Sequence, residues 1–220
     1  MTFSFEFALS ILPRILSTLT TTLLATIIGC LGAAFLGFLW EILRRSSKLG
    51  RYAMRFLIDF IRSTPLLVQI YFFYFVLPEY GLTLPALFVG VFALSLYYSG
   101  YLAEVFKGGI DSIPRGQFEA AKALGLKRLQ LVLLVVAPQM LRNVAAPMGN
   151  YFVSLLKATP YLAVIAVPEM LSIALEIASE TFRYAEPMTV VGIIFLTLAL
   201  CFSALVRMIE TRMRLSPKAG

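Results

Sequence analysis

The chain has 220 residues, of which 60% are hydrophobic and 14% are charged, and its formal net charge is +7. A soluble domain of this length exposes a large part of its residues to water, so it cannot hide so much apolar surface. The composition therefore argues against a soluble domain and predicts an integral membrane protein.

Residues that carry common enzyme chemistry are scarce. Histidine is absent, and both cysteines, Cys30 and Cys201, lie inside apolar runs, so neither fits a disulfide or a metal site. The sequence has no G-x-x-x-x-G-K-[ST] loop for nucleotide phosphates and no G-x-S-x-G nucleophile elbow. We expect a chain that is not an enzyme and that holds no cofactor or metal of its own.

The apolar segments predict about five transmembrane helices in a single domain, residues 1–220, although four or six remain open. A span needs roughly 20 apolar residues to cross about 30 Å of hydrocarbon. Pro160 and Pro168 should break or bend the fourth span, and the apolar run 129–141 is too short to cross. The expected spans lie near residues 15–40, 56–77, 84–103, 143–175 and 188–206.

The basic residues predict the orientation, because Lys and Arg favour the cytoplasmic side of short loops. Opposite them the chain carries mainly acidic residues, such as Glu6, Glu79 and Glu180. An outside N-terminus and a cytoplasmic C-terminus fit every loop. The positive charge is then explained by topology and by attraction to anionic lipid, not by nucleic acid. The basic residues are Arg44, Arg45, Lys48, Arg51 and Arg55, then Lys107, Arg115, Lys122, Lys127, Arg128 and Arg142, and finally Arg207, Arg212, Arg214 and Lys218.

The first span carries a small residue every four positions: Ala25, Gly29, Ala33 and Gly37. This spacing puts four small side chains on one face, where another helix backbone can approach closely. We therefore expect the first span to pack tightly against a neighbouring helix, in this chain or in a partner subunit.

Charged residues within the apolar segments need an explanation because they are costly in a membrane. Arg62, Glu104 and Lys157 lie near the expected inner ends of spans, so their side chains could reach the interface instead of serving in transport. Asp59 and Arg62 are three positions apart on one helix and could neutralise each other.

Polar residues beside prolines in the second and fourth spans predict a solute path between these spans. Pro65, Pro147 and Pro160 leave backbone groups without helical partners, and such backbone is tolerated where it is packed in protein or lines a cavity. The candidate path residues are Thr64, Gln69, Asn150, Ser154, Lys157 and Thr159.

A water-facing segment, residues 107–142, interrupts the apolar chain. It contains QFEAAKALGLKR, in which Glu119 falls early in a short helix, where the helix dipole favours a negative charge. Gly125 suits the position just past the helix end, where φ is positive. The pattern predicts two short helices forming a knob that could seat in a groove of another protein. A helical loop lying on the lipid headgroups remains an alternative.

The knob resembles the EAA loop of ATP-binding-cassette (ABC) importer permeases, whose pattern is E-A-A-x3-G-x9-I-x-L-P. Val135 and Ala137 depart from the isoleucine and leucine of that pattern. Ala158 stands where the polar amino acid branch of these permeases more often has an acidic residue, which leaves the substrate open. The segments similar to that branch are FIRSTPLLVQ (60–69), AEVFKGGIDSIPRGQFEAAKALG (103–125), APQMLR (137–142) and GNYFVSLLKATPYLAVIAVPEML (149–171).

The resemblance implies a type I ABC importer transmembrane domain in the bacterial cytoplasmic membrane, an all-α, multi-pass fold. It also implies two partner ATPase subunits that hold ATP and Mg²⁺, a second permease, identical or a sister chain, and a periplasmic or surface-anchored solute-binding protein. The solute would be a polar amino acid or a related zwitterion, such as an opine or ectoine. The residues that would contact the ATPase are Arg115, Glu119, Ala120, Ala121, Leu124 and Gly125.

A path without a motor could instead be driven by an ion gradient. In that alternative the chain is a secondary transporter or channel subunit, and Arg62, Glu104 and Lys157 are its ion-coupling groups.

Overall fold

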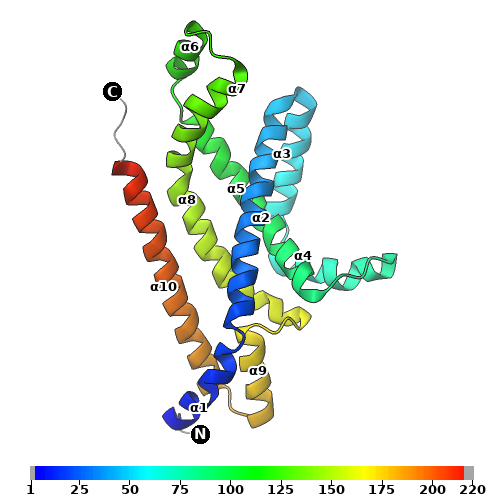
Figure 1. Ribbon diagram of the computed structural model, residues 1–220. Coiled ribbons are helices and arrows are strands. Elements are labelled where there is room, and N and C mark those ends of the chain that lie inside the picture. The colour runs from blue at the N-terminus through cyan, green and yellow to red at the C-terminus, as the bar shows by residue number, and fades with distance from the viewer. Residues whose placement is uncertain (1–2, 216–220) are drawn as a thin grey trace.

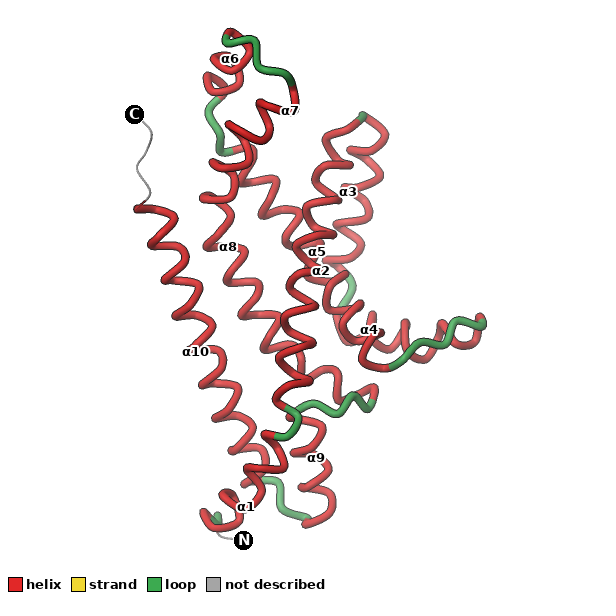
Figure 2. The backbone as a smooth tube through the Cα atoms, viewed as in Figure 1, coloured by secondary structure: helices red, strands yellow, loops and turns green. Residues whose placement is uncertain are grey.

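The computed structural model describes residues 3–215, and Lys218 of the expected tail lies outside this range. Within it, every regular element is helical, and the long helices form an elongated bundle joined by short loops (Figures 1 and 2). The α-helices are α1 (Phe5–Leu16), α2 (Leu19–Ser46), α3 (Lys48–Ser63), α4 (Leu66–Tyr71), α5 (Ala86–Asp111), α6 (Arg115–Ala123), α7 (Arg128–Gln130), α8 (Ala137–Ala158), α9 (Met170–Thr181) and α10 (Ala185–Leu215).

The expectation of about five spans agrees with the structure, which supports four or five. Four continuous helical segments are long and apolar enough to cross a membrane, and a bent pair of helices could supply a fifth crossing. The continuous segments are Leu19–Ser46, Ala86–Asp111, Leu131–Ile165 and Ala185–Arg212, and the bent pair is Lys48–Ser63 with Leu66–Tyr80.

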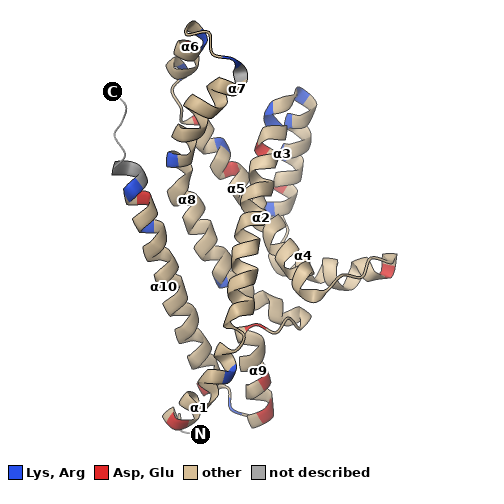
Figure 3. Ribbon diagram, in the orientation of Figure 1, with Lys and Arg blue, Asp and Glu red and all other residues tan. Residues whose placement is uncertain are grey.

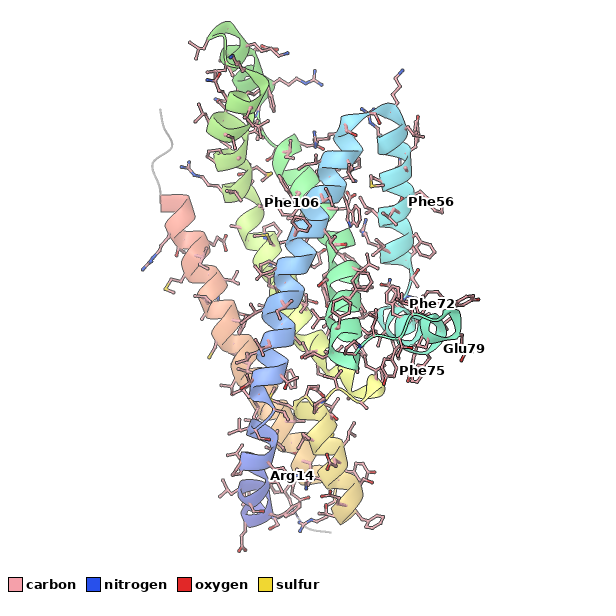
Figure 4. The ribbon with its side chains drawn as sticks, turned by 45° about the vertical axis from the view of Figure 1, so that its right-hand side comes forward. Arg14, Phe56, Phe72, Phe75, Glu79 and Phe106 are labelled. Carbon is pink, nitrogen blue, oxygen red and sulfur yellow. The ribbon has the colours of Figure 1, made fainter. Side chains whose placement is uncertain are left out.

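The second expected span, 56–77, is not one straight helix. Its two halves meet at 99°. Thr64 is extended there, with φ −93° and ψ 128°, because the ring of Pro65 disfavours helical backbone in the residue before it. After the bend, α4 continues through a π-helical turn, Phe72–Val76, and a 3₁₀ turn, Leu77–Tyr80. This arm points away from the bundle, with Phe72 and Phe75 along it and Glu79 at its end (Figure 4).

The fourth expected span, 143–175, begins and ends earlier than predicted. A π-helical turn, Leu131–Val136, leads directly into α8, so the run 129–141 is mostly part of this long helix and not a separate short segment. Pro138 lies just after this π-helical turn, and the helix continues through it. The helix stops at Ile165, and α9 is a separate helix beyond Pro168.

The core lies where α2 packs along α5. Ala25, Gly29, Ala33 and Gly37 are all buried, so the stripe of small residues mediates close packing within the chain. A Cβ atom on Gly37 would lie 2.9 Å from Leu102 Cβ, which leaves no room for a larger residue. Absence of side-chain bulk therefore sets the distance between these two helices.

A second, smaller core joins α1, α9 and the start of α10. Ile15, Met170, Ala174 and Ile177 fill it, and α1 is held from outside by Arg14. Arg14 donates to Glu180 at 2.5 Å and to Glu176 at 2.7 Å. This group of helices lies at the end of the bundle opposite α6 (Figure 1).

Basic residues concentrate at one end of the molecule. They lie on the loop end of α3, on α6 and the loop after it, and towards the end of α10, where acidic residues are interspersed, whereas α1, α9 and the end of the arm are mainly acidic (Figure 3). This concentration of Lys and Arg is what the positive-inside rule requires of a chain whose α6 end faces the cytoplasm.

Candidate functional site

The knob is built by helix α6, which stands beyond the ends of α5 and α8 (Figure 1). Ile113, buried to 5% exposure, anchors the chain as it leaves α5. Pro114 precedes the first helical residue of α6 and lacks the N–H that would have no partner there. Arg115 then begins the helix.

The sequence-predicted contact residues come together on α6 and its C-terminal bend. Glu119 and Ala120 are exposed, as is Arg115 at the start of the helix, and Leu124 is 79% exposed. Ala121 differs, because it is buried and fixes α6 to the bundle. The knob therefore presents Leu124 and three charged side chains, Arg115, Glu119 and Lys122, beside small ones.

Gly125 has the positive φ that the sequence predicts, 70°. Its N–H donates to Lys122 O at 2.9 Å, and Leu126 N donates to Ala121 O at 3.1 Å. These two bonds satisfy carbonyls at the end of α6 in the pattern of a Schellman motif, for which glycine is favoured.

Polar contacts that sequence reasoning missed hold the knob to α8. Asn143 Nδ2 donates to Ser112 Oγ at 2.8 Å, and Gln139 Nε2 donates to Gln117 Oε1 at 3.3 Å. A mainly apolar cavity of about 730 Å³, lined partly by Phe118 of α6, lies beside this connection. These contacts attach α6 and the end of α5 to α8.

A network of ion pairs joins α2 to α5 near the same end of the bundle. Arg44 pairs with Glu41 on its own helix and with Glu104 of α5, whose Oε1 lies 2.5 Å from Arg44 Nη1. Arg45 pairs with Glu41 and reaches Asp111 at 2.6 Å. Glu104 thus has an arginine partner in the fold, which sequence spacing could not show.

Two of the predicted path residues serve the bend in the second span. Gln69 is buried, and its Nε2 donates to Ile61 O at 2.9 Å and to Thr64 O at 3.3 Å. Thr64 Oγ1 donates to Phe60 O at 2.8 Å. These side chains hydrogen-bond carbonyls at the end of α3, where the helix is interrupted.

The predicted path residues of α8 divide between its surface and its interior. Asn150 and Lys157 are exposed, and Ser154 Oγ lies 3.1 Å from the hydroxyl of Tyr98 on α5. Thr159 is fully buried, and its Oγ1 donates to Leu156 O at 2.8 Å. The six candidates do not converge on one surface.

Tyrosines of α5 were missed as site residues, although LYYSGYL places them one turn apart. Tyr97 and Tyr101 have hydroxyls 3.1 Å apart, and the Tyr101 ring lies 5.4 Å from that of Tyr151 on α8. The guanidinium carbon of Arg62 is 5.2 Å from the Tyr101 ring centre. This cluster joins the second, third and fourth spans beside the bend.

The apolar spans, the broken second span and the helical knob at one end define the transmembrane subunit of a type I ABC importer. The chain belongs to the family of binding-protein-dependent transport system inner membrane components, whose profile matches residues 33–215. The expected family is thereby confirmed. Members are non-catalytic, multi-pass subunits of the bacterial cytoplasmic membrane, and the chain is a permease subunit of this kind.

Named relatives match along nearly the whole chain. A probable amino-acid ABC transporter permease of Sinorhizobium fredii is 42% identical over 97% of this chain and 92% of its own length. The glutamine transport system permease protein of Escherichia coli is 30% identical over 93% of this chain and 94% of its own. These relatives share the whole membrane domain and not merely the knob.

Solved structures give the same fold. A chain of an amino acid ABC transporter crystallised with histidines is 33% identical, with a TM-score of 0.89 over 96% of this chain and all of that one. A chain of an alginate ABC transporter, at 15% identity and a TM-score of 0.73, covers 98% of this chain and 85% of its own and supports the fold alone.

Proposed function

We propose that this permease forms the membrane path for a polar amino acid or a related zwitterionic solute, possible examples being an opine or ectoine. The relatives named for amino acids and for glutamine support this solute class, as does the similar transporter crystallised with histidines. The observation that carries the permease role is α6, an exposed helix attached to two membrane helices.

ABC importer permeases work with ATPase subunits and solute-binding proteins. We infer that two ATPases, which hold ATP and Mg²⁺, serve the importer. One of them docks on α6 of this chain through Arg115, Glu119, Ala120 and Leu124. Ala121 and Gly125 would set the shape of the contact. A second permease, identical or similar, would complete the path, and the exposed apolar arm of Leu66–Tyr80 offers it a surface.

Orientation and limits of the domain belong to the same proposal. Residues 1–220 form one transmembrane domain, with the α6 end in the cytoplasm and the N-terminus outside. The coupling segment is narrower than 107–142, because α5 continues to Asp111 and the fourth long helix begins at Leu131. Asn150, Ser154 and Lys157 remain path candidates, whereas Thr64, Gln69 and Thr159 contribute through the shape of the bent helices.

The comparisons give no support to the gradient-driven alternative, since the matched family depends on a binding protein. One of its three proposed ion-coupling groups, Glu104, is neutralised by Arg44 within the fold. A carboxylate held in this way is a poor candidate for reversible ion binding.

The test is ATP-dependent uptake by the permease reconstituted in liposomes with its ATPase and binding protein. Glu119→Lys and Ala120→Trp should lower uptake and ATPase co-purification about tenfold or more, as expected for a central interface contact. Glu79→Lys makes the same charge change on the arm, far from α6, and should leave ATPase attachment intact. Full attachment with both α6 variants would refute the coupling role.

A further inference from the structure

Four tyrosines and one arginine form a continuous cluster beside the bend in the second span. The ring centres of Tyr97 and Tyr98 lie 5.3 Å apart, as do those of Tyr97 and Tyr101. Tyr151 extends the cluster onto α8. Tyr97, Tyr101 and Tyr151 are partly exposed, whereas Tyr98 is buried and fixed by Ser154.

Arg62 is held over this cluster by α5. A Cβ atom on Gly100 would lie 3.0 Å from Arg62 Cγ, so the arginine stem crosses α5 where a side chain is lacking. The Tyr101 hydroxyl donates to Arg62 O at 3.5 Å, a long contact that adds to the ring stacking. The guanidinium is thereby directed along the face of a tyrosine ring.

Arg62 forms no ion pair with a carboxylate among residues 3–215. Asp59, the acid expected from spacing, instead lies 3.9 Å from Arg55. This corrects the expectation that Asp59 and Arg62 neutralise each other. An exposed guanidinium that stacks on tyrosine and lacks an acidic partner retains its capacity for two parallel hydrogen bonds to a carboxylate.

The surroundings reinforce this preference. Arg62 also lines a cavity of about 650 Å³ that has six basic and four acidic residues around it. Each of the four acids forms an ion pair with an arginine. The unbalanced charge is therefore positive, which attracts a carboxylate and repels a solute with net positive charge.

We propose that Arg62, held on Tyr101, binds the carboxylate of the transported solute and that the faces of Tyr97 and Tyr151 receive its ammonium end. An aromatic face attracts a cation, and a planar guanidinium matches a carboxylate, so the two together fit a zwitterion. The path accepts neutral, carboxylate-bearing zwitterions and discriminates against net cationic amino acids. This inference rests on the proposed function and names the solute class.

A direct binding assay without the solute-binding protein measures the selectivity of the permease itself. The permease–ATPase complex is placed in nanodiscs without the binding protein, and thermal stabilisation is measured with L-glutamine, L-histidine and L-glutamate. L-arginine supplies a net cation, and 4-aminobutanamide supplies glutamine without its carboxylate. Ligands that bind the folded state raise the melting temperature in proportion to their affinity.

We expect stabilisation by at least one neutral zwitterion and none by 4-aminobutanamide or L-arginine. Arg62→Gln should weaken that binding about 10- to 100-fold, as for loss of a charge-assisted hydrogen bond, and Arg62→Lys should restore part of it. Tyr101→Phe should bind nearly normally because it keeps the ring on which Arg62 lies. Tyr101→Leu lacks the ring and should bind the zwitterion more weakly. Arg207→Gln, a matched control that removes an exposed arginine of α10 outside this cavity, should bind normally.

Stronger binding of L-arginine, binding of 4-aminobutanamide, or no binding by any neutral zwitterion would overturn the inference. So would normal binding by Arg62→Gln. In parallel, ATP-dependent uptake by the complete importer distinguishes the two proposals. If the wild type and Arg62→Gln take up the solute equally well, the proposed binding site is refuted and the proposed function stands. If the wild type shows no ATP-dependent uptake, the proposed function itself is refuted.

Discussion

Individual small residues determine how closely the helices of this permease approach. The four-residue spacing of Ala25, Gly29, Ala33 and Gly37 predicts a contact face from sequence, and the structure shows that α5 covers it. The partly buried ion pair of Arg44 with Glu104 joins the same two helices. Its partners are distant in sequence, so spacing gives no sign of it.

Gly37→Ala should destabilise the permease by about 1–3 kcal/mol, the usual cost of adding atoms to a filled core. The new Cβ would lie 2.9 Å from both Leu102 Cβ and Ser99 O, and backbone cannot easily move away. Gly192→Ala is the matched control, because a Cβ there meets nothing within 4 Å. Thermal unfolding in detergent measures both, and equal melting temperatures would contradict the close packing.

At the scale of whole elements, breaks in the helices give this fold its shape. Pro65 allows a break to be predicted from sequence, but its 99° angle depends on where α4 packs. The fourth long helix shows the opposite case, since it runs past Pro138 without a break. Helix α1 and its attachment through Arg14 also went unpredicted, because its acidic partners lie on α9.

Attachment of α1 to α9 should weaken in acid. The hydrogen bond from Arg14 lowers the pKa of Glu180 in the folded protein, so the pair stabilises the fold above the ordinary glutamate pKa of about 4.3. This contribution is lost as the pH falls below that value and through the lower folded pKa. Arg14→Gln should remove the pH dependence.

Hydrogen exchange of the α1 amides, corrected for intrinsic pH effects, measures this change. Protection should fall in acid for the wild type and be low at all pH values in Arg14→Gln. Lys122→Gln removes an exposed positive charge from α6 and should behave as the wild type. Protection of α1 that stays constant down to about pH 3 would contradict the role of the ion pair.

Over the whole molecule, the separation of charge defines an axis. Basic residues of segments far apart in sequence gather at the α6 end, whereas the end that holds α1 and α9 is mainly acidic (Figure 3). The knob lies at the basic end, so the proposed coupling to the ATPase requires that this end face the cytoplasm. A chain inserted the other way would present α6 outside the cell.

Cysteine labelling tests this orientation. In a background with Cys30→Ser and Cys201→Ser, Lys122→Cys on α6 should react with a membrane-impermeant maleimide only in inside-out vesicles. Glu6→Cys on α1 should react only in intact spheroplasts. Both positions are exposed, so lack of reaction reflects the membrane and not burial. The reverse pattern would invert the topology.

The sequence alone determined the membrane class, the approximate spans, the small-residue face and the bend at Gly125. Each depends on composition or on neighbours within a few residues, where periodicity and backbone preference are read directly. Only the tertiary structure decided that Gln69 closes the broken helix, that Glu104 belongs to Arg44, and that Arg62 lies on Tyr101. These contacts join different helices or cross a break, so they depend on how the segments pack and not on their local pattern.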